Sequence, residues 1–181
     1  MAPNALSKQE AAKRLIHAAV VMSKTNADPL AFHVVASSAL NLLRELSKVD
    51  GPRFIERVYQ SALFNGASKK LAGEETGLPD HPVVNGWIEG LAKAIESGHV
   101  KEPTDIKING AQKLEVDALK HLMDPFNFLK HADKDPEGML DESAVKPVEA
   151  TSFAIGAYII LFPGDAVAEE VAEFLTQHGI I

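Results

Sequence analysis

The residues best suited to chemistry lie in one short stretch, from Pro125 to Pro136, which reads PFNFLKHADKDP. On a helix, Asn127, Lys130 and His131 are three or four residues apart and share one face. An amide, an ammonium and an imidazole on one face can bind an anion or a phosphodiester. His131 is the candidate general acid and base, because the ordinary pKa of imidazole lies near neutrality. The alternative is a short structural helix whose Asn and His bond to backbone, followed by an Asp-rich turn.

His33 is a second candidate, inside the strongly amphipathic segment 29–48. It lies at the edge of an apolar stripe, where a histidine commonly serves as a core or boundary residue bonded to a neighbour. The alternative is that His33 meets Asn127 and His131 across a pair of helices and forms a polar ligand pocket. Arg44, further along the same segment, is a candidate ligand-binding cation for that pocket.

A divalent metal is a further hypothesis, with His33, His131, Asp133 and Asp135 as ligands. Imidazole and carboxylate groups are suitable ligands for Zn, Mn or Fe. However, the sequence has no HExxH and no Glu-x-x-His pair, and it has no P-loop, dinucleotide-binding or nucleophile-elbow motif. We therefore expect no cofactor.

Composition restricts the partners and the compartment. The 181 residues include 18 Lys and Arg against 25 Asp and Glu, a net charge of −7, and no Cys. Scattered basic residues on an acidic chain disfavour RNA or an anionic membrane surface as the main partner, although a small basic spot can still engage RNA locally. The absence of cysteine excludes disulfides and thiolate chemistry and favours the cytoplasm. The longest apolar run, 153–162, is about half of the roughly 20 residues that span a bilayer.

The elements that position these residues are predicted to be helices. Apolar residues recur at three- and four-residue spacing, and Ser7 to Glu10 has the spacing of a capping box. Asp28-Pro29 and Asp124-Pro125 each indicate a helix start, and Asn65-Gly66 indicates a turn. The expected helices cover approximately 7–24, 29–48, 53–64, 84–97, 111–123, 125–132, 143–162 and 165–178.

These elements predict an all-α, single-domain multi-helix bundle of about seven to eight helices over residues 1–181, with 65–110 as an insertion or irregular region. The run 157–162 is ambiguous between a buried strand and a helix, and we favour helix because no partner strand is predicted. Trp87 is expected in the core.

Two segments resemble a family of small uncharacterised bacterial proteins. One runs from Asp28 to Leu46 and has an Asp-Pro-x-x-x-His helix start, and the other, Asn127 to Pro136, carries an Asn-Phe-x-Lys-His-Ala-Asp-x-Asp-Pro signature. The family implies no established activity.

The segment 126–131 is also similar to the Arg-[Asn/Asp/His]-x-x-x-His motif of the HEPN superfamily, whose helical bundles often dimerise and whose active members cut RNA. Asn127 and His131 occupy the polar and histidine places, whereas Phe126 stands in the arginine place. Without that cation, RNA cleavage would need Lys130 or Arg44 as a replacement. The resemblance implies a homodimer and suits a binding or regulatory relative better than a nuclease.

Three functional hypotheses follow from the sequence. The first is a cytoplasmic helical protein in which the polar cluster organises the bundle or lines a ligand pocket. The second is a HEPN-like RNA-binding protein or ribonuclease that uses Asn127, Lys130 and His131. The third is a metal-dependent enzyme that uses His33, His131, Asp133 and Asp135.

Overall fold

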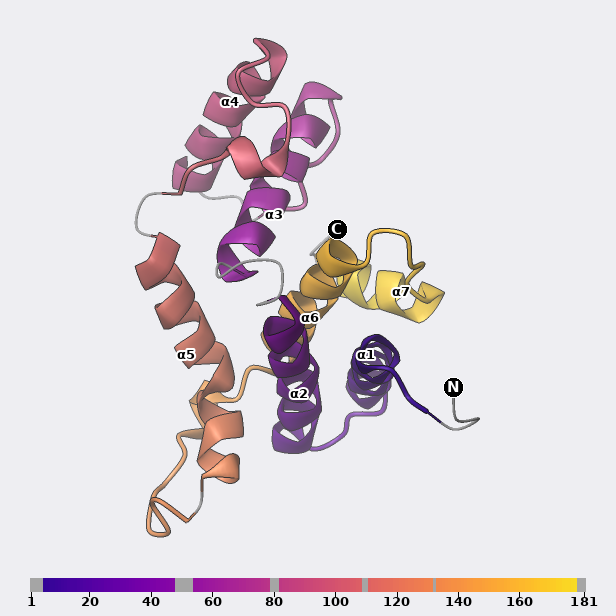
Figure 1. Cartoon of the computed structure of the whole chain (residues 1–181), viewed down its shortest axis with the longest axis vertical. Coiled ribbons are helices and arrows are strands. Elements are labelled where there is room, and N and C mark those ends of the chain that lie inside the picture. Colours follow the sequence, from indigo (N-terminus) through magenta and orange to yellow (C-terminus); the bar gives the residue numbers. More distant parts are fainter. Residues whose placement is uncertain (1–4, 48–53, 79–81, 109–110, 132, 179–181) are drawn as a thin grey trace.

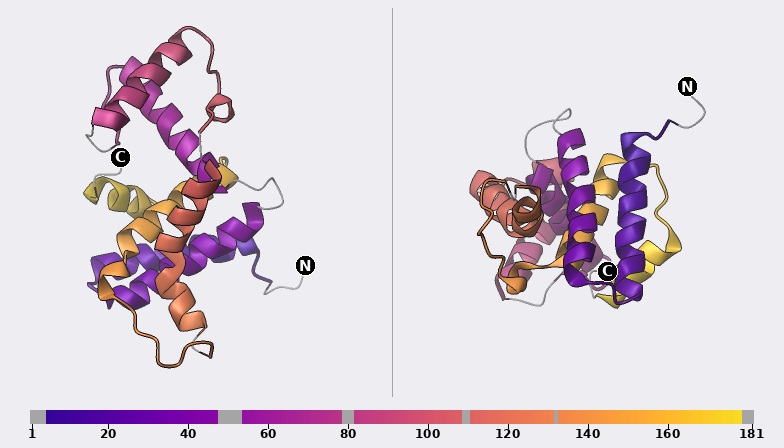
Figure 2. Two further views of the ribbon diagram at one scale, coloured as in Figure 1. Left: turned by 90° about the vertical axis from the view of Figure 1, so that its left-hand side faces the viewer. Right: turned by 90° about the horizontal axis from the view of Figure 1, so that it is seen from below.

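The computed structural model of the chain describes residues 5–47, 54–78, 82–108, 111–131 and 133–178, and within these ranges it contains seven α-helices and no strand. Figure 1 shows their arrangement, and Figure 2 shows two further views. The helices α1, α2, α6 and α7 form a body, and the pair α3 and α4 projects from it. The all-α bundle predicted from the sequence is confirmed.

The core of the body lies between α1 (Lys8–Lys24), α2 (Pro29–Ser47), α6 (Pro147–Leu161) and α7 (Glu169–Gln177). Each of these helices buries residues three and four positions apart, which is the pattern that places side chains on one helical face. The larger buried side chains are Ile16, Val20, Phe32, Leu40, Leu43, Ile155, Tyr158 and Phe174. The segment 157–161 is helical, as expected.

The starts of the first two helices follow from single side chains. The hydroxyl of Ser7 accepts from the backbone N–H of Glu10 at 3.0 Å, and the carboxylate of Asp28 accepts from the N–H of Ala31 at 3.0 Å. These caps satisfy donors that a helix start leaves free. The second half of the predicted capping box differs, because the Glu10 carboxylate pairs with Arg14 at 2.7 Å.

The helices α3 (Phe54–Leu71) and α4 (Pro82–Glu96) form a hairpin with a small apolar cluster of its own, around Ala67, Ile88 and Ala92. The predicted turn at Asn65-Gly66 is wrong, because α3 continues through it. A Cβ at Gly66 would lie 2.8 Å from Leu78 Cδ1, so the glycine lets the returning chain pack against the helix. Gly98, with φ of 74°, follows the end of α4 as expected.

The predicted break at Asp124-Pro125 is also wrong. Instead, α5 (Ala111–Lys130) is one helix that contains Pro125, whose side chain is fully buried. Short 3₁₀ turns, η1 (Pro103–Asp105) and η2 (Glu142–Ala144), precede α5 and α6. The buried side chain of Gln60 donates to the carbonyl of Ile106 at 2.7 Å, which holds the chain after η1 against α3.

Two further expectations need correction. Trp87 is 58% exposed on α4 rather than in the core, because Ile88 and Ala92 occupy the face of α4 that packs on α3. The last helix begins at Glu169 rather than near Asp165, because the Asp165 carboxylate is bonded to Lys13 and Tyr158 instead of capping a helix.

Candidate functional site

His33 is completely buried and bonded to backbone on both sides of its ring. Its Nε2 lies 3.0 Å from the carbonyl oxygen of Leu122, and its Nδ1 accepts from the N–H of Lys146 at 2.9 Å. A carbonyl can only accept and an amide N–H can only donate, so these partners define a neutral ring with its proton on Nε2. Burial lowers the pKa of His33, which also favours the neutral form. Both nitrogens are therefore engaged, and neither bonds to Asn127 or His131.

The residues of the Asn-Lys-His cluster lie at the end of α5. Asn127 and Lys130 have exposed side chains, and His131 is half-buried. The ammonium of Lys130 lies 6.0 Å from the centre of the Phe126 ring. Within the described part of the chain, the side chains of Asn127 and His131 form no hydrogen bond. The two residues are joined only through the backbone, where the N–H of His131 donates to the carbonyl of Asn127 at 3.0 Å. The cluster forms an open surface, and its proposed role in RNA binding or catalysis stays a prediction.

Asp133 and Asp135 follow α5 in an exposed turn. The described residues contain no group of three or more His, Cys, Asp or Glu side chains placed to hold a metal ion. Because His33 uses both ring nitrogens within the protein, the four proposed ligands are not brought together, and the metal hypothesis gains no support from the geometry.

Arg44 is partly buried near the end of α2. Its Nη2 donates to Asn41 Oδ1 at 2.9 Å and to Glu45 Oε1 at 3.0 Å. Its Nε is buried and has no hydrogen-bond partner among the described residues. The guanidinium thus interacts with residues of its own helix.

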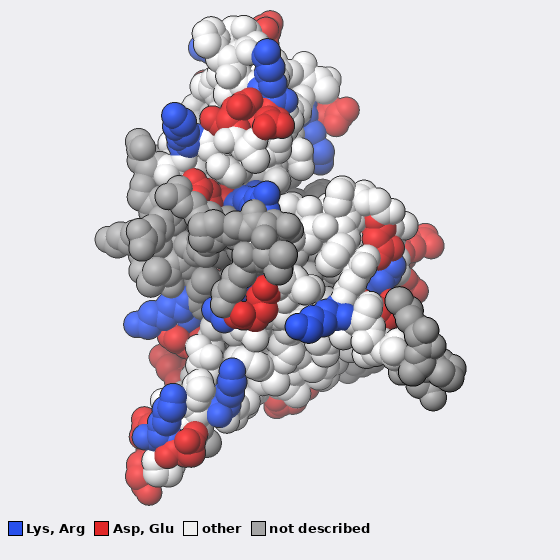
Figure 3. All heavy atoms as spheres, viewed as in Figure 1, with Lys and Arg blue, Asp and Glu red and all other residues white. Residues whose placement is uncertain are grey.

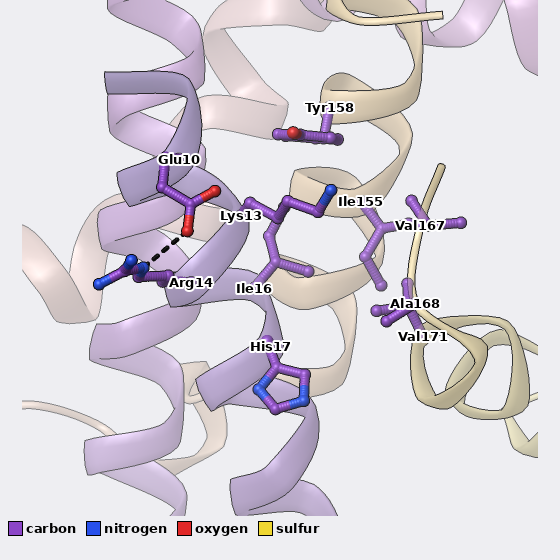
Figure 4. Close-up of a pocket in the computed structure, with 10 residues that line it drawn as sticks. All are labelled: Glu10, Lys13, Arg14, Ile16, His17, Ile155, Tyr158, Val167, Ala168 and Val171. Atoms are coloured by element: carbon purple, nitrogen blue, oxygen red, sulfur yellow. Dashed lines mark hydrogen bonds and ion pairs between the residues drawn. The ribbon is translucent and has the colours of Figure 1, made fainter. Parts of the chain in front are cut away.

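A pocket that the sequence did not indicate lies between α1, α6 and the start of α7 (Figure 4). Its volume is about 270 Å³, and its apolar walls include Ile16, Ile155 and Val171. One face of α1 supplies charged or titratable side chains at its edge, namely Glu10, Lys13, Arg14 and His17.

The charges around this α1–α6–α7 pocket are neutralised within the protein. Lys13 Nζ lies 2.7 Å from Asp165 Oδ1, and the hydroxyl of Tyr158 donates to the other oxygen of the same carboxylate. These two partners lower the pKa of Asp165, with the Lys13 bond as the larger cause. Arg14 is paired with Glu10, so the positive and negative charges at the rim of the pocket compensate each other. The bonds of Asp165 to Lys13 and Tyr158 also join the α6–α7 connection to α1.

A larger groove lies between α3 and α6 and has a volume of about 460 Å³. We call it the α3–α6 groove. The helices approach each other at Gly156, where a Cβ would lie 3.7 Å from Val58, and at the edge-to-face ring pair of Tyr59 and Phe153, 5.9 Å between centres. The lining is mainly apolar and comes from α3, α6, α7 and the turn after α3: Val58, Ser61, Ala62, Asn65, Ser68, Lys69, Thr76, Gly77, Leu78, Ser152, Ile155, Gly156, Ile159, Ile160 and Leu175.

Sequence reasoning missed both the pocket and the groove. The available signal for the groove was the run 153–162, which is apolar on successive residues and therefore on all sides of a helix. The run predicts a buried element, but its composition does not show what covers each face of the helix.

Comparison of the chain with protein-family models, with curated proteins and with solved structures gives no match. On the face shown in Figure 3, basic and acidic side chains are interspersed, and no continuous basic stripe crosses it.

Proposed function

We propose that this protein binds a small ligand with a hydrocarbon body in the α3–α6 groove, as a helical binding protein of the cytoplasm. The observation that carries the proposal is the second apolar face of α6. One face of this helix, including Ala154, Tyr158 and Ala157, is buried in the body, whereas Ile159 is 42% exposed and Ile160 is partly exposed in the groove.

A helix that is apolar all round is normally covered all round. The segment Glu142–Leu161 is long and apolar enough, by length and composition, to cross a membrane, and only 33% of its most apolar window is buried inside the protein. Its packing against α1 and α2 is that of a core helix. A hydrocarbon ligand would cover the remaining apolar face without removing α6 from this core.

The size and lining of the groove support a small-molecule ligand. Its volume of about 460 Å³ lies within the roughly 300–1,000 Å³ usual for ligand sites. Apolar atoms form most of the lining surface, and six of the fifteen lining residues carry polar or charged side chains, so the groove combines an apolar wall with hydrogen-bonding groups as ligand sites do. The α1–α6–α7 pocket is smaller, at about 270 Å³, and its charged rim is already paired.

The test is a titration of the full chain with hexanol, octanol and decanol, followed by NMR or calorimetry. Because each buried methylene contributes about 0.8 kcal/mol, the affinity should rise about fourfold per methylene until the chain fills the groove. Ile159→Glu should abolish binding because it places a charge in the groove lining.

Val21→Glu on α1 is the matched control, since Val21 is also 42% exposed but does not line the groove. It should bind the alcohols as the wild type does. The proposal is contradicted if affinity does not depend on chain length, or if the two glutamate variants behave alike while both remain folded by circular dichroism.

A further inference from the structure

We infer that the α3–α6 groove selects a ligand with an anionic head group, a free fatty carboxylate, and that Lys69 holds that head group. This inference rests on the proposed function and adds the class of ligand. It follows from the position of one ammonium group at the rim of an apolar groove.

Lys69 and Lys70 are neighbours on α3 in different surroundings. Lys70 is exposed and pairs with Glu89 of α4 at 3.3 Å. Lys69 is half-buried and lines the groove, and among the described residues its ammonium group has no hydrogen bond or ion pair. A partly desolvated ammonium without an acidic partner favours an anion supplied from outside.

The groups around Lys69 suit a carboxylate. Asn65, Ser68 and Thr76 also line the groove, and their amide and hydroxyl groups can donate hydrogen bonds. Among the residues that the structure describes, no Asp or Glu lines the groove. Apart from Ser61 and Ser152, the remaining lining is apolar and includes Ile159, Ile160 and Leu175, so the site provides an apolar surface for a chain beside donors for an anionic head.

The test compares decanoate, decanol and decylammonium, which share one chain, at pH 7.5. Wild type should bind decanoate about tenfold more tightly than decanol, because one charge-assisted hydrogen bond at a partly solvated site changes the affinity by about that factor. Decylammonium should bind more weakly than decanol, because its charge repels that of Lys69.

Lys69→Gln should abolish the preference for decanoate over decanol, and Lys69→Arg should keep that preference. Lys70→Gln is the matched control, since it makes the same charge change at the adjacent residue and should keep the preference. If decanol binds and decanoate has no advantage, or if the advantage survives in Lys69→Gln, the inference is overturned while the proposed function stands. If none of the three compounds binds, both fail.

A vesicle experiment separates a free carboxylate from a lipid surface. The protein should remain in the supernatant when phosphatidylglycerol vesicles are sedimented, because a carboxylate chain enters the groove as a monomer. If the wild type sediments with the vesicles and Lys69→Gln sediments less, the inference that the ligand is a free carboxylate is overturned, and a membrane surface is the ligand instead.

Discussion

The imidazole Nε2 of His33 on α2 donates to the carbonyl oxygen of Leu122 on α5 at 3.0 Å, three residues before Pro125. Pro125 has no N–H, so the helix loses one of its bonds at this turn. The hydroxyl of Ser37 donates to the same carbonyl at 3.3 Å. Two side chains of α2 therefore hold the proline-containing turn of α5 against the body, and His33 also binds the N–H of Lys146 just before α6.

Replacing His33 should strongly destabilise the protein. In His33→Ala, the buried N–H of Lys146 loses its acceptor and the carbonyl of Leu122 loses its closer donor. We expect a loss of about 3 kcal/mol in the free energy of unfolding, because each buried polar group left unpaired costs about 1–3 kcal/mol. Urea unfolding measures the change, with His17→Ala as the control at an exposed histidine. Equal stability of the two variants would refute a structural role for His33.

The buried imidazole also predicts a pH dependence. Burial lowers the pKa of His33 below its ordinary value of 6.5, so between the two values the unfolded chain binds a proton that the native protein does not. The contribution of His33 to stability is therefore complete above pH 6.5 and declines as the pH falls below it. His33→Gln should flatten the unfolding free energy between pH 5 and 7 relative to wild type, whereas His17→Gln should not.

Alanine substitutions at three helical glycines should change the stability of the protein by different amounts, according to the space beside each glycine. Gly86 and Gly90 of α4 have no neighbour within 4 Å of an added Cβ, so alanine should stabilise the protein by about 0.5–1 kcal/mol at each. At Gly66 the added carbon would meet Leu78 at 2.8 Å and Ile88 at 3.2 Å. Gly66→Ala should therefore be less stable than Gly90→Ala in thermal unfolding. The reverse order would refute the packing of Leu78 on α3.

The exposed end of α5 should contribute little to stability. Asn127→Ala and Lys130→Ala should each change the free energy of unfolding by no more than about 0.5 kcal/mol, as is usual for surface side chains. Denaturant unfolding of both variants beside wild type measures this. A loss of 2 kcal/mol or more would mean that Asn127 satisfies a buried group.

Local signals in the sequence predict the starts of the first two helices correctly. Ser7 and Asp28 cap helices because a short side-chain oxygen reaches free backbone N–H groups, whatever the rest of the fold does. Gly98 ends α4 because its positive φ suits glycine.

The same kind of signal failed where distant residues intervene. Asn65-Gly66 has the composition of a turn, yet Gly66 is helical because Leu78 and Ile88 pack against its bare backbone. Asp124-Pro125 has the composition of a helix start, yet α5 continues through it, with Pro125 buried and with His33 and Ser37 of α2 bonded to the carbonyl of Leu122 one turn earlier. Local propensity does not contain these contacts.

The candidate site was not predictable in the same way. The α3–α6 groove depends on how closely two helices approach at Gly156 and Val58, and this distance is set by the packing of the whole body. The sequence showed that 153–162 is apolar, but it did not show which of these residues the core would leave uncovered.

The most direct test of ligand binding in the α3–α6 groove is an NMR titration of isoleucine methyl groups with decanoate. We expect the largest shift at Ile159, which lines this groove, with a shift at Ile160 beside it, and none at Ile16 of the α1–α6–α7 pocket or at Ile88 of the α3–α4 cluster. Shifts centred on Ile16, or no saturable shift at Ile159, would contradict the account.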